Sequence, residues 1–294
     1  MTATYSRPET IDQALELTGR DGATTLAGGT DIVPRIHRRK LDPSMLVDIR
    51  GVLPSGIVDE DGALRIGAGA TLAAIAEHAG IAERYAVLSE AAKAAASPQL
   101  RHAGTVGGNL AQHVRCWYYR HPDLRCWLNG GDTCYAQIGD HRKHGLEPGD
   151  CISVAPSDLA AALGALGAAV ELRSAQGARS VPLLELYRRP SEEHRSAVAL
   201  LPGELIVAVE LPRVPEASAY VRAGERAAWS FALVGVAAAR FGGGERHLVA
   251  IGVTNEPRAL DPDDPLRGLD GLEQTRWKRT LLGALCERAL AALS

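Results

Sequence analysis

The amino-acid sequence predicts an α+β protein made of two successive units. Its 294 residues are long for one simple domain, so more than one packed unit is expected. In the first part, short apolar runs alternate with helical patterns and with glycine-rich loops. From about residue 176 the pattern changes to strands followed by one long helix, an order typical of a separate α+β unit. We therefore expect a first unit over 1–180 and a second over 181–294, with a soft boundary near 177–190.

Capping and stop signals define the elements of the first unit. Thr10 and Gln13 form a capping-box pattern before an apolar stripe, and Gly19 ends that helix. Thr71 and Ser157 are expected to cap two further helices. The elements expected in this unit are helices at 11–17, 71–78, 89–96 and 158–166, and strands at 24–27, 45–49, 63–67 and 168–172.

Later segments have less regular signals. Polar stretches at 174–180 and 188–196 indicate surface connections. The second unit is expected to contain strands at 204–211, 230–241 and 248–254 and a helix at 276–293. Residues 111–152 have no helical or strand period, and a stretch of that length in a compact domain indicates function or disorder. Its aromatic residues and four cysteines favour an ordered, functional segment.

Composition excludes several classes of protein. Lys and Arg number 32 against 35 Asp and Glu, a net charge of −3, so a nucleic-acid partner is not expected. No run of about 18 apolar residues exists, so no membrane span is expected. Residues 1–8 are polar and lack the apolar core of a signal peptide. No arrangement of Ser, His, Cys or carboxylates forms a recognisable catalytic frame.

Two glycine loops are candidate anion sites. Gly28-Gly29-Thr30-Asp31 follows an expected strand, and 104–109 repeats the combination of glycines with threonine. Adjacent glycines let backbone N–H groups approach an anion closely. Each loop alone is also compatible with a plain tight turn, but the pair favours a diphosphate site. A Rossmann fingerprint is absent, because Leu72 stands where its third glycine is required.

These motifs resemble those of a known family, the flavoprotein subunits of molybdenum hydroxylases, which includes enzymes like xanthine dehydrogenase and carbon monoxide dehydrogenase. The first loop matches the family's first FAD loop, the second matches its second loop, and Pro156-Ser157-Asp158 resembles its third element. Segments 201–206 and 220–239 resemble its C-terminal strands. The residues in the two loops are Leu26, Ala27, Gly28, Gly29, Thr30, Asp31 and Ile32, and Thr105, Val106, Gly107, Gly108 and Asn109.

The resemblance implies a vanillyl-alcohol-oxidase-type (PCMH) FAD domain followed by a small α+β C-terminal domain. It implies that backbone amides of both loops wrap the FAD diphosphate, that Asp158 reaches the diphosphate or ribose side, and that Ile206 lines the isoalloxazine. Relatives with covalent flavin carry histidine in the first loop, whereas this chain has Thr30, so the FAD is expected to be non-covalent. Residues 220–231 contain no lysine, and the residue that contacts the ring stays unassigned.

Four of the five cysteines lie within the irregular segment, at Cys116, Cys126, Cys134 and Cys151. Zinc ribbons usually have close Cys pairs, and this spacing has none. Four thiolates suit a 4Fe–4S cluster. Zinc, disulfides or free thiols remain alternatives. The fifth cysteine, Cys286, is expected to be a core thiol, since it shares an apolar helix face with its neighbours four residues away.

The cysteine segment resembles the loop of hydroxybenzoyl-CoA reductase and of a bacterial aldehyde oxidoreductase group, whose flavin subunits carry an extra 4Fe–4S cluster. Cys151 has the least similar spacing, and His141 and His144 are possible substitute ligands. Nearby Arg115, Arg120 and Arg125 either offset the thiolate charge or only solvate the loop.

The resemblance implies an electron-transfer role within a heterotrimer. Substrate is oxidised on a molybdenum-cofactor subunit, electrons pass through a 2Fe–2S subunit to the FAD of this chain, and an external acceptor receives them. The alternatives are a stand-alone FAD oxidoreductase and a zinc-stabilised adaptor without a redox role. A cytoplasmic location is expected, with export alongside a partner still open.

Overall fold

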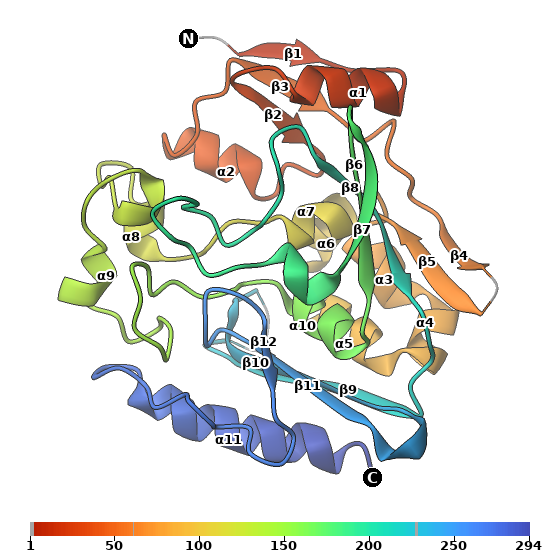
Figure 1. The fold of residues 1–294 in the computed structure, drawn as a ribbon, viewed down its shortest axis with the longest axis vertical. Helices are drawn as coiled ribbons and strands as arrows, with labels where there is room; N and C mark the ends of the chain where they lie inside the picture. Colours follow the sequence, from red (N-terminus) through yellow and green to blue (C-terminus); the bar gives the residue numbers. More distant parts are fainter. Residues whose placement is uncertain (1–2, 61, 227–228) are drawn as a thin grey trace.

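Three β-sheets and the helices between them form the structure (Figure 1). The computed structural model describes residues 3–60, 62–226 and 229–294. The N-terminal sheet is parallel in the order β1-β3-β2, with strands β1 (Thr4–Ser6), β2 (Ala23–Leu26) and β3 (Met45–Asp48). Helix α1 (Ile11–Thr18) precedes β2, and helix α2 (Ile32–His37) follows it. Thr10 caps α1 as predicted, because its hydroxyl accepts the Gln13 N–H at 3.2 Å.

The middle sheet is antiparallel and five-stranded, in the order β4-β5-β8-β6-β7. Its strands are β4 (Ile57–Glu60), β5 (Ala63–Gly67), β6 (Ala169–Ser174), β7 (Gly177–Pro182) and β8 (Leu205–Leu211). Residues 174–180, expected as a surface connection, contain the turn that joins β6 to β7 and also the first part of β7. β7 is an edge strand with mostly exposed side chains, which explains its polar sequence.

The C-terminal sheet is antiparallel in the order β12-β11-β10-β9. Its strands are β9 (Ala217–Gly224), β10 (Ala232–Arg240), β11 (Arg246–Ile251) and β12 (Arg258–Leu260), and helix α11 (Arg276–Ala291) covers one face. The opposite face packs against helices of the middle unit, which consists of the middle sheet and the helices next to it. These helices include α5 (Ala86–Ala94) and α10 (Asp158–Ala165). Successive side chains of β10 point to opposite faces of the sheet, and both faces are packed. Ala237 and Ala239 belong to the core on one face, and Val236 and Ala238 belong to the core on the other.

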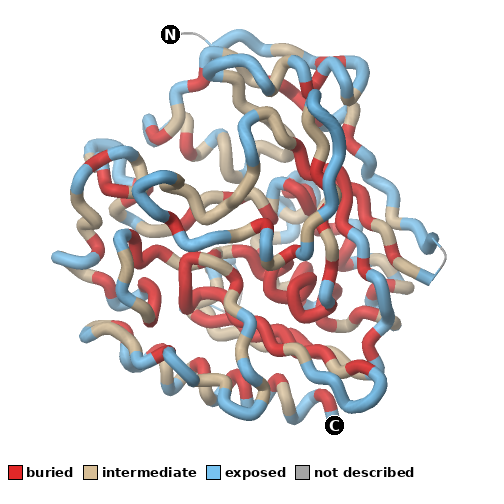
Figure 2. Tube along the Cα trace, in the orientation of Figure 1, coloured by how far each residue is buried: buried red, intermediate tan, exposed pale blue. Residues whose placement is uncertain are grey.

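Short helices connect the sheets. Thr71 caps α3 (Leu72–Glu77) as predicted, and Ser97 and Thr105 cap α6 (Pro98–Ala103) and α7 (Val106–Leu110). The second glycine loop therefore begins a helix. These connecting helices are α3 (Leu72–Glu77), α4 (Ala79–Arg84), α6 (Pro98–Ala103) and α7 (Val106–Leu110), with 3-10 turns η2 (Leu183–Leu186) and η3 (Gly242–Gly244). Burial concentrates where α5 and α10 lie over the C-terminal sheet (Figure 2).

The cysteine segment lies on one side of the molecule, between α2 and α11 (Figure 1). It is ordered but largely irregular, with only short turns of helix: α8 (Trp117–Arg120), η1 (Trp127–Asn129) and α9 (Tyr135–Ile138). Cys286 is fully buried beside Leu282 in the core under α11, which confirms its prediction as a core thiol. Among the described residues, no helix has the length and apolar character needed to cross a bilayer.

Candidate cofactor site

A cavity of about 360 Å³ lies where the N-terminal sheet meets the middle unit. Segments far apart in the chain meet there, and most of the predicted FAD-binding residues line it. The predicted residues in its wall are Ala27, Gly28, Gly29, Thr30, Asp31, Ile32, Thr105, Gly107, Gly108 and Ile206. Leu26, Val106, Asn109 and Asp158 do not line it, although they lie in the same or adjoining elements.

The first glycine loop is packed tightly against the second segment. A Cβ atom at Gly28 would lie 1.8 Å from the carbonyl oxygen of Ala103, and Gly29 has φ +73°. Both positions therefore require glycine. Among the described residues, no hydrogen-bond acceptor pairs with the backbone N–H groups of Gly28, Gly29, Thr30 or Asp31. This loop offers a row of free amide donors to an anion.

The second glycine loop differs in a way that the sequence did not indicate. Its amides are already engaged: Val106 N–H donates to Ala70 O at 2.8 Å, Gly107 N–H to Ala68 O at 2.9 Å and Gly108 N–H to Thr105 Oγ1 at 3.1 Å. Thr105, Gly107 and Gly108 still form part of the cavity wall. The free amide donors therefore belong to the first loop, and the amides of Val106, Gly107 and Gly108 in the second loop are already paired.

One cationic side chain without an assigned role in the sequence, that of Arg35, lies at the same cavity. Arg35 lines it, is almost fully buried, and forms no ion pair with any carboxylate in the described part of the chain. Its Nε atom has no hydrogen-bond partner. A buried guanidinium without a counter-charge is costly, so this residue fits an anionic ligand. The sequence signal for this role was the position of Arg35, three residues after the start of the helix that follows the first glycine loop.

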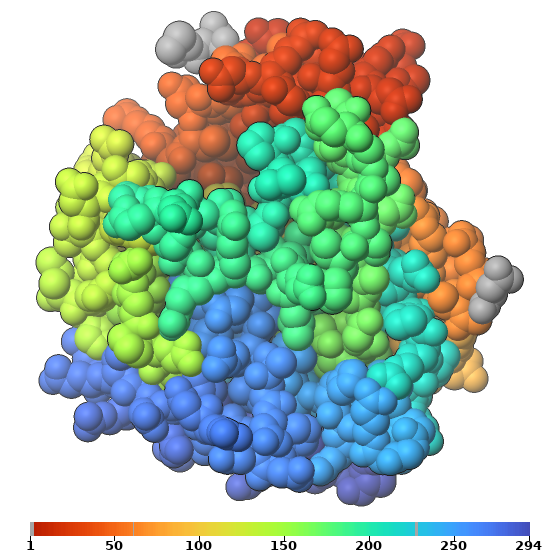
Figure 3. All heavy atoms as spheres, viewed as in Figure 1, coloured from red at the N-terminus to blue at the C-terminus, as the bar shows by residue number. Residues whose placement is uncertain are grey.

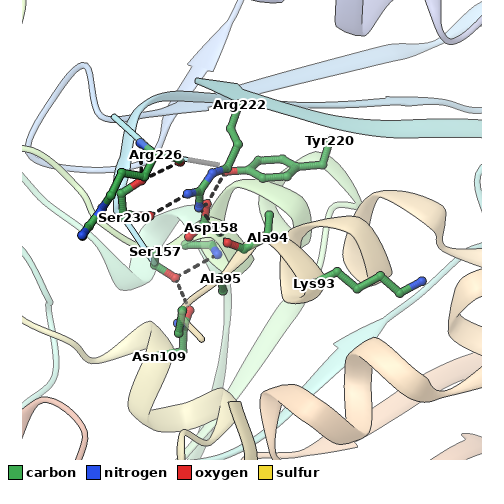
Figure 4. Close-up of polar contacts among 12 residues, drawn as sticks. Lys93, Ala94, Ala95, Asn109, Ser157, Asp158, Tyr220, Arg222, Arg226 and Ser230 are labelled. Carbon is green, nitrogen blue, oxygen red and sulfur yellow. Dashed lines mark hydrogen bonds and ion pairs between the residues drawn. The ribbon is translucent and has the colours of Figure 1, made fainter. Parts of the chain in front are cut away.

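Asp158 lies in a separate buried network (Figure 4). Its carboxylate accepts a hydrogen bond from Tyr220 Oη at 2.6 Å and from Arg222 Nη1 at 3.1 Å. Burial raises the pKa of Asp158 despite the adjacent Arg222 guanidinium. Ser157 caps α10 and donates to Asn109 Oδ1 at 2.6 Å, so the predicted Asn109 supports this network and does not line the first cavity.

Asp158 lines a second cavity of about 510 Å³ between the middle unit and the C-terminal sheet. Aromatic side chains give this cavity walls suited to a planar ring, and Cys116 reaches its edge. The chain passes from the first cavity at Gln112 directly to the second cavity at Arg115. The lining of this second cavity includes Arg115, Cys116, Trp117, Asp158, Trp229 and Phe231.

All four clustered cysteines line one small cavity of their own, together with aromatic residues. All are free thiols, so the disulfide alternative does not hold in this structure. His144 Nε2 lies 3.2 Å from Cys116 Sγ. Burial raises the pKa of Cys116 to about 11, whereas a hydrogen bond with Cys151 lowers the pKa of Cys134.

The cysteine geometry does not suit a single ion. Across residues 3–60, 62–226 and 229–294, no group of three or more His, Cys, Asp or Glu side chains is placed to hold one metal ion. A zinc ion needs its thiolates within about 2.3 Å of one point. A multi-iron cluster spreads its thiolate ligands further apart, so four cysteines around one cavity are compatible with it.

An ion-pair network joins the first glycine loop to the cysteine segment. Asp31 Oδ1 lies 2.7 Å from Arg120 Nη2 and 2.9 Å from Arg115 Nη1, and Asp31 Oδ2 accepts the His113 N–H at 3.2 Å. Burial alone would raise the pKa of Asp31, but Arg115 and Arg120 together lower it. Arg115 also stacks over the Phe231 ring at 4.4 Å, at the wall of the second cavity.

The segment 188–198 covers the cysteine segment from the outside, as the adjacent green and yellow-green atoms in Figure 3 show. Arg195 Nη1 donates to the carbonyl oxygens of Trp127 at 3.0 Å and Gly131 at 2.7 Å. Trp127 Nε1 donates to Glu192 Oε1 at 2.8 Å. The polar stretch expected at 188–196 as a surface connection therefore also holds the loop that carries Cys126.

The free amides and the buried Arg35 make the first cavity suitable for an anionic cofactor. A family model described as the FAD binding domain in molybdopterin dehydrogenase matches residues 1–214. The chain belongs to this family, and the predicted fold class and family resemblance are confirmed at that level.

Similar proteins agree with this assignment. The aldehyde oxidoreductase FAD-binding subunit PaoB of Escherichia coli (strain K12) is 37% identical over 268 residues, covering 89% of this chain and 84% of PaoB. The carbon monoxide dehydrogenase medium chain of Afipia carboxidovorans is 29% identical, covering 85% of this chain and 73% of that protein. Quinoline 2-oxidoreductase from Pseudomonas putida 86 shares the fold, with a TM-score of 0.73 at 21% identity, covering 100% of this chain and 97% of that chain. The chain is thus a flavoprotein component of an oxidoreductase.

Proposed function

We propose that this chain binds FAD non-covalently and carries a 4Fe–4S cluster on Cys116, Cys126, Cys134 and Cys151. The observation that carries the proposal is the convergence of these cysteines on one cavity, whose residue Cys116 also lines the aromatic second cavity. Bound FAD accepts electrons in pairs and an iron–sulfur cluster passes them singly. Two such groups beside one shared residue suit an electron-transfer role.

FAD fits the two larger cavities. The free amides of Gly28 to Asp31 and the unpaired Arg35 provide donors and positive charge for the diphosphate. We assign the flavin ring to the second cavity, between its aromatic walls and the Asp158 network, because this brings it next to Cys116. Ile206, which lines the first cavity, then contacts the opposite end of FAD, which differs from its expected position at the isoalloxazine.

The cluster fits the surroundings of the cysteines. Four thiolates bound to iron bring negative charge into a buried site, and Arg115 and Arg120 on the same segment carry an excess of positive charge over their single partner, Asp31. His144 provides a ring nitrogen beside Cys116 Sγ. The unsuitability of the site for one ion argues against the zinc-stabilised adaptor.

The partners follow from the relatives. One is named an FAD-binding subunit and another a medium chain, names that indicate multi-subunit enzymes and argue against a stand-alone oxidoreductase. We propose that this chain joins a molybdenum-cofactor large subunit and a 2Fe–2S small subunit in a heterotrimer. It receives electrons from the 2Fe–2S subunit and passes them to an external acceptor. A cytoplasmic location remains part of the proposal.

Two cysteine variants test the cluster assignment. Cys126→Ser, purified anaerobically, is expected to lose its iron, because Cys126 lines the cysteine cavity. It is expected to keep its FAD, because Cys126 lines neither of the two larger cavities. The matched control is Cys286→Ser, in the core under α11, which is expected to keep both. Iron, acid-labile sulfide and FAD are counted per chain. Full iron content in Cys126→Ser would exclude this residue as a ligand, and failure of the iron-free variant to bind FAD even when FAD is supplied in excess would contradict separate sites.

A further inference from the structure

We infer that FAD binding and cluster assembly in this chain are thermodynamically coupled, and that Asp31 is the positioning residue that couples them. The inference rests on the proposed function, because it requires both groups to bind. It concerns the affinity of each site for its cofactor. By linkage, whatever free energy one cofactor adds to the binding of the other must be the same in both directions.

Asp31 belongs to the FAD loop but is held by the cysteine segment. It directly follows the free amides of Gly28 to Thr30, and its own N–H is one of the free donors. Its carboxylate is bound by Arg120, Arg115 and the backbone N–H of His113, which all lie between the second glycine loop and the end of α8. The backbone conformation that presents the amides is therefore fixed by side chains next to Cys116.

Arg120 transmits the position of α8 to Asp31. Its Nε atom donates to Val114 O at 2.9 Å, and its Nη2 atom donates to His113 O at 3.2 Å as well as to Asp31. The guanidinium thereby joins both sides of Cys116 to the FAD loop. It is also buried, so these bonds are not replaced by water when they break.

Helix α2 makes a second connection between the two sites. It begins at the FAD loop, and the residues after it reach the cysteine segment. Arg38 Nη1 donates to Arg120 O at 3.5 Å, and Lys40 Nζ donates to Leu124 O. Both ends of the connection from Asp31 to Lys40 are thus attached to residues 113–124, which flank Cys116.

The coupling predicts that each cofactor binds more tightly when the other cofactor is present. Ligation of Cys116 and Cys126 fixes residues 113–124, and this holds Asp31 and the free amides in place before FAD arrives. Without the cluster, these residues gain freedom, and FAD binding has to order them. FAD is therefore expected to bind more weakly to cluster-free protein, and bound FAD is expected to slow the loss of iron.

The experiment compares FAD affinity with and without the cluster. FAD-depleted protein is titrated with FAD anaerobically, following flavin fluorescence, in the Cys286→Ser variant with cluster and the Cys126→Ser variant without. The Kd is expected to be at least about fivefold higher without the cluster, the lower range of typical allosteric coupling. Asp31→Asn, added to each variant, is expected to bring this ratio close to one, whatever it does to the absolute Kd.

Matched controls and a second variant keep the outcome decisive. Asp140→Asn removes an exposed ion pair with Arg142 in the cysteine segment, and the ratio is expected to stay unchanged. If Asp31→Asn does not fold, Arg120→Gln is used, with the same expected loss of coupling. Equal Kd values with and without the cluster, or a ratio that survives Asp31→Asn, overturn the inference and leave the proposed function standing. Absence of iron from the Cys286→Ser variant overturns the proposed cluster and the coupling together.

Discussion

Gly28 packs directly against the backbone of Ala103 at the edge of the first cavity. A Cβ atom there would overlap the carbonyl oxygen of Ala103, a backbone atom that cannot turn away as a side chain can. We expect Gly28→Ala to abolish stable FAD binding and to lower the free energy of unfolding by about 1–3 kcal/mol, as overpacking does. FAD content per chain and thermal unfolding measure the two effects.

Gly56→Ala is the matched control, because a Cβ atom at Gly56 meets nothing within 4 Å and its φ is ordinary. This variant is expected to keep its FAD and its stability. A Gly28→Ala protein that binds FAD as tightly as Gly56→Ala would contradict the assignment of this loop to the diphosphate.

The contribution of single residues could be predicted only where a local pattern exists. Both glycine loops have a similar composition, yet the amides of the second are engaged by Ala68 and Ala70, which are distant in sequence. The pairing of Asp31 with Arg120 spans 89 residues and leaves no local signal. The loops were visible in the sequence, but which loop has free donors depends on tertiary contacts.

The N-terminal sheet depends on a buried carboxylate in β3. Asp48 accepts hydrogen bonds from the Arg50 guanidinium at 2.6 and 2.9 Å and from Tyr5 Oη. The hydrogen bond from Arg50, reinforced by that from Tyr5, holds the pKa of Asp48 well below its ordinary value of 3.8. A folded-state pKa below that of the unfolded chain stabilises the protein above about pH 4, and this contribution is lost as the pH falls further.

We therefore expect Asp48→Asn to lower the free energy of unfolding at pH 7 by about 1.5–3 kcal/mol, the range for hydrogen bonds to charged groups. The variant should also show a weaker loss of stability between pH 4 and pH 2 than the parent protein. Denaturant unfolding at several pH values measures both. Asp12→Asn, which removes an exposed ion pair, serves as control, and parallel acid profiles for Asp48→Asn and the parent would contradict this role.

The longer helices and most strands could be predicted from caps and apolar periods, whereas the pairing of strands depends on tertiary structure. The pattern that predicted β8 gave no information about its partners. β8 pairs with β5 and β6 of the middle sheet, beyond the expected boundary at 180. We propose a boundary between β8 and β9, a position that agrees with the end of the family match at residue 214.

At the scale of the whole molecule, the three sheets leave room for the cysteine segment on one side, against α2, α11 and residues 188–198 (Figure 1). The cysteine count and spacing suggested a cluster, but only the fold brings the four thiols to one cavity beside the aromatic one. The local sequence does not predict the distance between Cys116 and Cys151, because irregular segments have no period from which geometry follows. The resemblance to a family, and not periodicity, predicted an iron–sulfur cluster on these cysteines.

We propose that one chain holds both a flavin and a four-iron cluster. The most direct measurement is the visible absorption spectrum of the anaerobically purified protein, with iron and sulfide counted per FAD. We predict flavin bands with a broad shoulder near about 400 nm and about four iron per FAD, as expected for one 4Fe–4S cluster. Flavin without iron in such a preparation would contradict the cluster and leave the FAD fold intact, and a folded, colourless protein that does not take up FAD would contradict both.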